Sequence, residues 1–177
     1  MIRHSPSMYA REIMTATELL SRLRSHGLTL VTAESCTGGL LAGAITEIAG
    51  SSDVFAGGVI TYSNALKHDL LDVPADMLAR HGAVSETVAR AMAEGALCRL
   101  GADMALSVTG VAGPGGGSPE KPVGLVHFAA ALKDWPTLHR ECRFGDKGRS
   151  EVRCLSVDAA LALAAELLGS VPSKVGQ

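Results

Sequence analysis

The chain has 177 residues, of which 47% are hydrophobic and 19% are charged, so its composition is that of one globular domain and not of a disordered segment. Its 16 basic and 18 acidic residues leave a formal net charge of −2, which argues against nucleic acid as a direct partner. No apolar run approaches the roughly 18 residues that a membrane span needs, and residues 1–11 lack the apolar stretch of a secretory signal. We therefore expect a single cytoplasmic domain over residues 1–177, with reduced cysteines and no membrane contact.

In the first half of the chain, apolar spacing and glycines predict helices that alternate with strands. Residues 1–9 show no period and predict a loose tail. Apolar residues from Ile13 to Leu23 then recur at helical spacing until Gly27 ends the pattern. The elements that follow are a strand over 28–33, a helix over 40–49, a strand over 54–61 and a short helix over 64–71.

The second half of the chain begins with a predicted helix that Ser85 can cap and that Gly101 closes. The glycine- and proline-rich residues 113–122 predict irregular structure. The remaining elements are strands over 104–111, 123–132 and 137–144 and a helix over 150–168, followed by a loose tail over 170–177. Strands that alternate with helices and end in a hairpin predict an α/β fold, a three-layer α/β/α sandwich with a five-stranded mixed β-sheet.

The first segment that can carry chemistry, residues 34–39, lies where a predicted strand leads into a helix. Ligands in such folds bind beyond the carboxyl ends of parallel strands. Ser35 is a candidate nucleophile, and the backbone N–H groups of residues 37–39 favour an anion or a developing oxyanion. Ser35 or Thr37 can also serve only as a helix cap. Cys36 is an alternative nucleophile if the helix N-terminus depresses its pKa, and otherwise a small packing residue.

The second segment follows the second predicted strand and contains Tyr62 and Lys67, a candidate acid/base pair. A lysine accepts a proton only when it is neutral, so this role requires that desolvation or a cation such as Arg149 lowers its pKa. We expect both side chains to reach Ser35 across the end of the sheet. The alternative is a surface lysine beside a half-buried tyrosine. The chain has no GxGxxG motif, so hydride transfer with a nicotinamide cofactor is disfavoured.

Two further segments offer groups that can hold an anion. The glycine run within residues 107–117 follows a predicted strand and forms either a nest of N–H groups or a flexible crossover loop. Before the last helix, Lys147 and Arg149 can hold a phosphate or carboxylate, or simply face solvent. The histidines and cysteines show no metal-ligand spacing, so we expect no metal and no cofactor. A Ser-His-Asp triad stays open, although no histidine is singled out by its position.

The chain carries an ordered set of five short motifs: Ala33-Glu34-Ser35-Cys36-Thr37-Gly38-Gly39, Tyr62-Ser63-Asn64 with Lys67, His81-Gly82-Ala83-Val84-Ser85, Thr109-Gly110-Val111-Ala112-Gly113-Pro114 and Lys121-Pro122-Val123-Gly124. This set resembles the CinA C-terminal domain family, the nicotinamide-nucleotide amidases. The resemblance covers the chain from about Leu19 to Leu168, and the ordered set is far more specific than any one motif. Larger competence/damage-inducible CinA proteins carry a further N-terminal domain, so a chain of 177 residues is expected to be the stand-alone form.

The resemblance implies hydrolysis of the carboxamide of nicotinamide mononucleotide to nicotinic acid mononucleotide and ammonia, without a metal. It implies that Ser35 is the nucleophile, Lys67 the base and Tyr62 the assisting tyrosine. It also implies a three-layer sandwich with a five-stranded mixed sheet, in agreement with the predicted elements. We expect substrate contacts from Thr37, Gly38, Gly39, Thr109, Gly110, Gly113, Gly116 and Arg149.

One segment departs from the family pattern of Gly-Asp-Arg, two residues and Val-Arg. Here the motif is longer than the family pattern, so Lys147 fills the arginine position when counted forward from Gly145, and Arg149 fills it when counted back from Arg153. We favour Arg149, because the helix fixes the register. A nucleotide-binding module without turnover and a Cys36-dependent amidase remain as alternatives, and a competence role rests on the family name alone. For assembly we expect a homo-oligomer, with a dimer favoured.

Overall fold

A five-stranded mixed sheet forms the centre of the computed structural model, which describes residues 6–171, with side chains from Ala16 onward. The strand order is β2-β1-β3-β4-β5. Strand β1 pairs in parallel with β2 and β3, whereas the β3–β4 and β4–β5 pairs are antiparallel, as the predicted hairpin requires. The strands are β1 (Leu30–Glu34), β2 (Phe55–Ile60), β3 (Met104–Gly110), β4 (Leu125–Leu132) and β5 (Leu138–Arg143).

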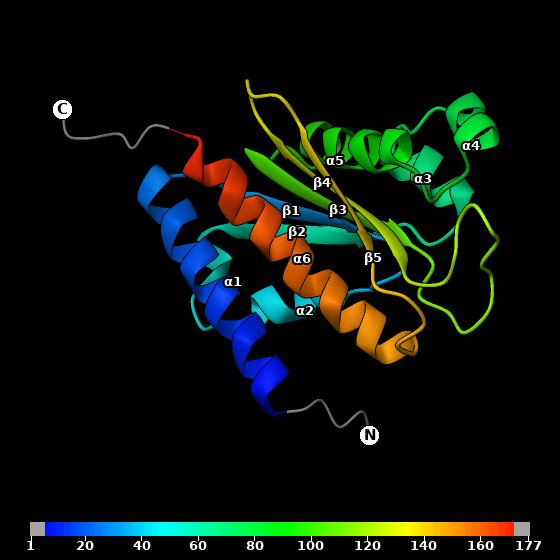
Figure 1. The fold of residues 1–177 in the computed structure, drawn as a ribbon. Coiled ribbons are helices and arrows are strands. Elements are labelled where there is room, and N and C mark those ends of the chain that lie inside the picture. Colours follow the sequence, from blue (N-terminus) through cyan, green and yellow to red (C-terminus); the bar gives the residue numbers. More distant parts are fainter. Residues whose placement is uncertain (1–5, 172–177) are drawn as a thin grey trace.

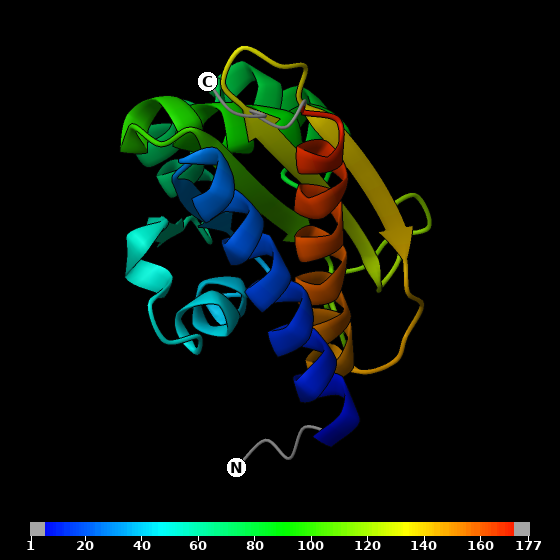
Figure 2. The same cartoon turned by 90° about the vertical axis from the view of Figure 1, so that its left-hand side faces the viewer.

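Helices cover both faces of this sheet, which confirms the predicted α/β/α sandwich (Figure 1). On one face lie α1 (Pro6–His26), α2 (Leu40–Thr46) and α6 (Arg149–Gly169), and on the other α3 (Asn64–Leu71), α4 (Ala75–His81) and α5 (Glu86–Leu100). Figure 2 shows α1 and α6 side by side across the sheet. Among the helices of residues 6–171, none has the length and apolar character that crossing a membrane requires.

Strand β1 is buried along its whole length because helices cover both of its faces. Its alternate side chains divide between the two layers. Val31 and Ala33 pack in the core beneath α3, α4 and α5. Glu34 points to the opposite face, where its carboxylate contacts the backbone of α2. The next residue, Ser35, therefore turns back toward the layer that contains α3.

The element bounds differ from the predictions in several places. Helix α1 begins at Pro6, within the stretch where we expected a loose tail, because proline fits the first turn of a helix. Helix α4 was not predicted, because seven residues after Pro74 are too few to display a helical period. The C-terminal tail was expected from residue 170, but Ser170 and Val171 still donate backbone hydrogen bonds to the last turn of α6. Residues 172–177 lie outside the described residues.

Candidate functional site

Ser35 follows β1 at the carboxyl ends of the parallel strands, where the sequence places a candidate nucleophile. Its backbone N–H donates to the carbonyl of Val108 over 2.9 Å, which extends the β1–β3 ladder by one residue. The chain then turns through Gly38 and Gly39, both of which have positive φ angles (57° and 96°) that favour glycine. This turn leads directly into α2 and leaves the Ser35 side chain only 8% exposed.

Lys67 contacts Ser35 from helix α3, although 32 residues separate the two in sequence. The helix is capped by Ser63, whose hydroxyl accepts a hydrogen bond from the N–H of Leu66. One turn later, the fully buried Lys67 side chain brings its Nζ within 3.1 Å of Ser35 Oγ. Nζ also donates to the carbonyl of Thr61 over 2.7 Å. The structure thus brings together the two residues that the sequence proposes as nucleophile and base.

Burial lowers the pKa of Lys67 from 10.5 to about 8, and a negative charge on Cys36 acts in the opposite direction. The cation Arg149, which we considered as a cause, does not contribute to this shift. With a pKa of about 8, roughly a tenth of the amine is neutral at pH 7, compared with well under a thousandth for an ordinary lysine. Lys67 can therefore accept a proton near neutral pH.

Cys36 lies beside Ser35 but has the properties of a packing residue. Burial raises the pKa of its thiol to about 12. The thiolate is the nucleophilic form of cysteine, so a thiol with this pKa is unreactive near neutral pH. The structure therefore gives no support to the Cys36-dependent alternative.

The Glu34 carboxylate occupies the N-terminus of α2. Oε2 accepts hydrogen bonds from the N–H groups of Gly39 (2.9 Å) and Leu41 (3.1 Å), and Oε1 accepts one from Ala42 (2.8 Å). This negative side chain satisfies backbone donors that a helix start leaves without partners. Sequence reasoning missed this role of Glu34, although strand alternation could have indicated that a residue next to Ser35 points toward α2.

The Glu34 contacts correct the expectation that residues 37–39 all face an oxyanion. The Gly39 N–H donates to Glu34, and the Gly38 N–H donates to the carbonyl of Ser35 over 3.1 Å. Of these three N–H groups, only that of Thr37 donates to no acceptor among the described residues. Arg153 holds the same turn by donating to the Thr37 carbonyl over 2.8 Å. Thr37 itself is fully buried, and its Oγ1 has no hydrogen-bond partner among the described residues.

Replacing Glu34 by glutamine is expected to lower the free energy of unfolding by about 1–3 kcal/mol. The amide removes the negative charge from three hydrogen bonds and points an N–H₂ group at backbone donors. Urea unfolding would measure the change. Glu47→Gln, at an exposed position just after the same helix, is the control and should shift stability by less than about 0.5 kcal/mol. Equal effects of the two substitutions would contradict this role of Glu34.

The Tyr62 side chain lies at the rim of the site. We expected it to reach Ser35, but its hydroxyl contacts Arg149 instead. It is 61% exposed, and its hydroxyl accepts a hydrogen bond from Arg149 Nη2 over 3.2 Å. The same guanidinium donates through Nη1 to the carbonyl of Gly113 over 3.0 Å. Tyr62 meets Lys67 only through its backbone carbonyl, 3.4 Å from Nζ. Tyr62 lies in the short connection between β2 and α3, where the neighbouring Ser63 is also exposed.

The position of Arg149 also bears on the register of its lengthened motif. Arg149 is the first residue of α6 and joins the glycine loop to Tyr62. Lys147 is exposed, and its side chain has no hydrogen bond or ion pair with any described residue. Arg149 is thus the cation that lies at the site, in agreement with the register counted from the helix.

Thr109 and Gly110, at the end of β3, have structural partners. The Thr109 hydroxyl is buried and donates to the carbonyl of Ala83 over 2.9 Å, so its proton is engaged within the fold while its oxygen keeps acceptor capacity. A Cβ at Gly110 would lie 2.7 Å from the carbonyl oxygen of Leu125, closer than real side chains approach. Gly110 therefore permits the close approach of β4 to β3.

The two predicted glycines of the following loop differ in their surroundings. Gly113 has a φ of 79°, and a Cβ there would lie 2.6 Å from Val123 Cγ1. Gly116 has a φ of 82° and no heavy atom within 4 Å of a Cβ position. Gly116 is therefore the more open of the two, on the exposed part of the loop.

Two histidines that are not neighbours in the sequence, His127 on β4 and His139 on β5, lie side by side in the structure. Their rings stack with Nδ1 of His127 3.0 Å from Nε2 of His139, and burial lowers the pKa of both. Neither contacts Ser35, whose hydroxyl partner is Lys67, so the described residues form no Ser-His-Asp triad. Within the same part of the chain, no group of three or more potential ligands is placed to hold a metal. This pair depends on the β4–β5 register, which the sequence does not reveal.

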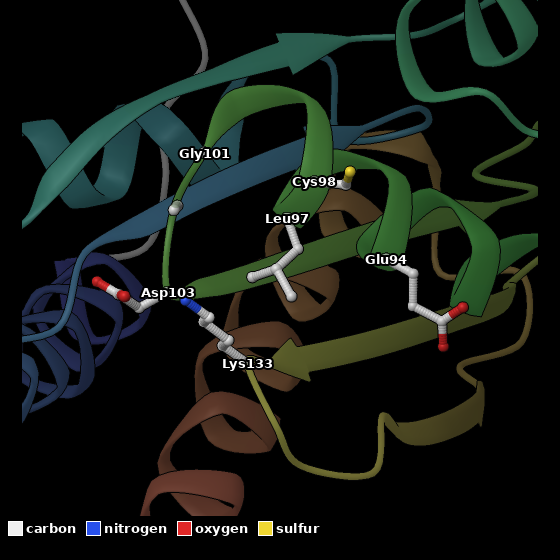
Figure 3. Close-up of a pocket in the computed structure, with 7 residues that line it drawn as sticks. Glu94, Leu97, Cys98, Gly101, Asp103 and Lys133 are labelled. Atoms are coloured by element: carbon white, nitrogen blue, oxygen red, sulfur yellow. The ribbon is translucent and has the colours of Figure 1, made fainter.

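Figure 3 shows a pocket of about 360 Å³. Its lining residues lie at the end of the sheet where β3 begins, opposite the strand ends that carry Ser35. It is formed where α5 ends, β3 begins and β4 ends, and Lys133 extends toward Asp103 there. Its lining residues include Glu94, Leu97, Cys98, Gly101, Asp103 and Lys133. None of these was predicted as a site residue, and the pocket has no contact with the Ser35–Lys67 pair.

The fold and the site define a class of protein: an α/β/α sandwich with a buried serine–lysine pair at the carboxyl ends of its parallel strands. The chain belongs to the CinA family, since the family model described as the CinA C-terminal domain matches residues 13–168.

Known proteins similar to this chain include relatives and solved structures of the same family. A CinA-like protein of Synechococcus sp. is 59% identical over 84% of the chain, and one of Mycolicibacterium gilvum is 50% identical over 91%. The chain spans only 36% and 38% of those two relatives. The structure of the competence/damage inducible protein CihA from Agrobacterium tumefaciens matches with a TM-score of 0.88 and 46% identity, over 96% of this chain and 100% of that one. A CinA superfamily protein from Klebsiella pneumoniae matches with a TM-score of 0.86 and 36% identity, over 90% of this chain and 99% of that one.

Proposed function

We propose that the chain hydrolyses the carboxamide of nicotinamide mononucleotide to nicotinic acid mononucleotide and ammonia, with Ser35 as the nucleophile. The observation that supports this most strongly is the buried Lys67 amine, 3.1 Å from Ser35 Oγ with a pKa of about 8. An amide is inert in water, so its hydrolysis needs an activated nucleophile of this kind. The substrate is assigned by the family resemblance, and the reaction type is supported independently by the serine–lysine geometry.

In the first half of the proposed reaction, Ser35 Oγ attacks the carboxamide carbon while neutral Lys67 takes the hydroxyl proton. The negative charge that develops on the carboxamide oxygen needs donors, and the Thr37 N–H is the candidate because Gly38 and Gly39 are engaged elsewhere. The C–N bond then breaks as the Lys67 ammonium returns the proton to the departing nitrogen. The products of this half are ammonia and an acyl-enzyme on Ser35.

The anionic part of the substrate is assigned to the rim of the site. Arg149 presents a planar guanidinium between Tyr62 and the loop that contains Gly113, and such a group suits a phosphate. We place Tyr62 with Arg149 on the substrate, because its hydroxyl contacts Arg149 and not the serine–lysine pair. Gly116 lies in the same open loop and can approach the phosphate through its backbone.

Ammonia release from nicotinamide mononucleotide by the purified protein tests the proposal directly. We expect turnover with this substrate and much weaker turnover with nicotinamide riboside, which lacks the phosphate. Calorimetry with nicotinamide mononucleotide is the companion measurement. Tight binding of the nucleotide without ammonia release would replace the proposal by the nucleotide-binding module without turnover.

Prolonged dialysis against EDTA is expected to leave ammonia release unchanged, because the proposed steps use only Ser35, Lys67 and backbone groups. The same assay before and after dialysis measures this. A loss of activity that zinc or manganese restores would contradict the proposed steps.

A further inference from the structure

One hydroxyl next to the serine–lysine pair has no role in the steps above. The Thr61 side chain is fully buried, and its Oγ1 forms no hydrogen bond with any group in the described part of the chain. Buried hydroxyls almost always have a partner, because leaving one unsatisfied costs stability. A buried hydroxyl of this kind indicates a ligand or water that completes it.

The backbone of Thr61 places this residue at the site. Its N–H donates to the carbonyl of Glu34 over 2.8 Å, which continues the β1–β2 ladder past the end of β2. Its carbonyl accepts the 2.7 Å hydrogen bond from Lys67 Nζ, shorter than the 3.1 Å between Nζ and Ser35 Oγ. Thr61 therefore contacts the candidate base directly and lies beside the strand end that carries Ser35.

Strand alternation puts the Thr61 side chain on the same face of the sheet as Ser35. Ala33 and Val59 are paired across β1 and β2, and both pack in the core beneath α3 and α5. Ser35 and Thr61 each lie two residues further along, so their side chains return to that same face. The Thr61 hydroxyl thus lies in the layer where Lys67 meets Ser35.

We propose that Thr61 is a positioning residue whose hydroxyl holds the water that hydrolyses the acyl-enzyme. This inference rests on the proposed function, since it concerns the second half of that reaction. Once Ser35 is acylated, its oxygen no longer has a proton to give, and the Lys67 lone pair becomes available to a water. That water needs further polar partners, and the Thr61 hydroxyl, which both donates and accepts, supplies one.

The proposed step is balanced in atoms and protons. The water oxygen attacks the acyl carbon while Lys67 takes one proton from the water. The C–Oγ bond then breaks, and the Lys67 ammonium returns that proton to Ser35 Oγ. The product is a carboxylic acid, which ionises and releases its proton to solvent.

The chain contains a matched control for this hydroxyl. Thr32 is also fully buried, and its Oγ1 likewise has no partner within the described residues. It lies on β1 opposite Gly58, where a Cβ would be 2.1 Å from the Thr32 hydroxyl. One residue out of phase with Val31 and Ala33, Thr32 points to the other face of the sheet. Loss of its hydroxyl removes a similar buried group but leaves the Ser35 side unchanged.

The test compares Thr61→Val, Thr61→Ser and Thr32→Val in rapid-quench assays with nicotinamide mononucleotide. Ammonia release reports formation of the acyl-enzyme, and intact mass reports how much accumulates. We expect Thr61→Val to release one burst of ammonia, to accumulate the adduct and to turn over about 100-fold more slowly. Thr61→Ser keeps the hydroxyl and should stay within several-fold of the wild type, as should Thr32→Val.

Normal turnover of Thr61→Val would overturn the inference, as would slower turnover in which no adduct accumulates. If Thr61→Val fails to fold, Thr61→Ala takes its place with the same expected burst and adduct. The proposed function fails differently: the wild-type protein itself would then release no ammonia and form no adduct.

Discussion

Replacing Ser35 by alanine is expected to lower kcat for ammonia release by roughly 10³-fold or more while the protein stays folded. The substitution removes one hydroxyl whose hydrogen-bond partner is Lys67 Nζ, so the surrounding core is left intact. Circular dichroism and thermal unfolding would verify the fold, and rapid-quench mass spectrometry should detect no adduct.

Cys36→Ala is the matched control, because it changes the adjacent residue in the same turn. We expect this variant to retain turnover, since burial keeps the thiol protonated with a pKa of about 12. Near-normal turnover of Ser35→Ala would refute the serine mechanism. If Cys36→Ala alone were inactive, the nucleophile would be the thiol.

Replacing Lys67 by arginine is expected to abolish nearly all turnover while nucleotide binding is retained. Arginine keeps the positive charge but does not deprotonate in the accessible pH range, so it cannot accept the Ser35 proton. In the wild-type protein, kcat/KM should rise with pH through about 8, as the neutral form of Lys67 becomes populated. A Lys67→Arg variant that is active with the same pH profile would show that another group is the base.

The buried amine also has an expected effect on stability, which Lys67→Met would reveal. The pKa of Lys67 is about 8 in the folded protein and 10.5 as an ordinary lysine, so between these values the unfolded chain binds more protons than the folded one. Wild-type stability should therefore rise with pH across this window, and the full cost of the buried charge applies below pH 8. Lys67→Met should be inactive but more stable than wild type at pH 7, by up to about 3 kcal/mol, with a smaller gain at pH 10. Urea unfolding at the two pH values measures this, and a variant less stable at pH 7 would contradict it.

The alternation of strands and helices could be predicted from the sequence because each element is specified by nearby residues. Apolar periods and glycines located the five strands, and the mixed sheet followed from the predicted terminal hairpin. The approach of Lys67 to Ser35 is different, since the two are 32 positions apart in sequence. Residue spacing alone left a surface lysine as an alternative, and the family resemblance was needed to favour the pair.

The side-chain contacts that could not be predicted depend on tertiary placement. Tyr62 points to Arg149, which is 87 residues away in sequence, and no local pattern encodes that contact. The turn after Ser35 is expected from the sequence to bind an anion of the substrate. In the structure, the backbone N–H groups at the start of α2 instead bind the Glu34 carboxylate of the same chain. A helix N-terminus shows in sequence that donors are available, but not which acceptor the folded chain supplies.

Glu34 ends β1 and Ser35 follows it, and their side chains lie on opposite faces of the sheet. Glu34 accepts hydrogen bonds from helix α2, and Ser35 contacts Lys67. A one-residue slip of β1 would exchange them, bringing a carboxylate to the lysine and leaving the helix with a hydroxyl. Such a misfolded chain could keep its helices and strands and yet have neither a nucleophile nor a capped helix. Enzymatic turnover would therefore report whether β1 has paired in the correct register during refolding. Far-ultraviolet circular dichroism would not, because it measures only the content of helix and strand.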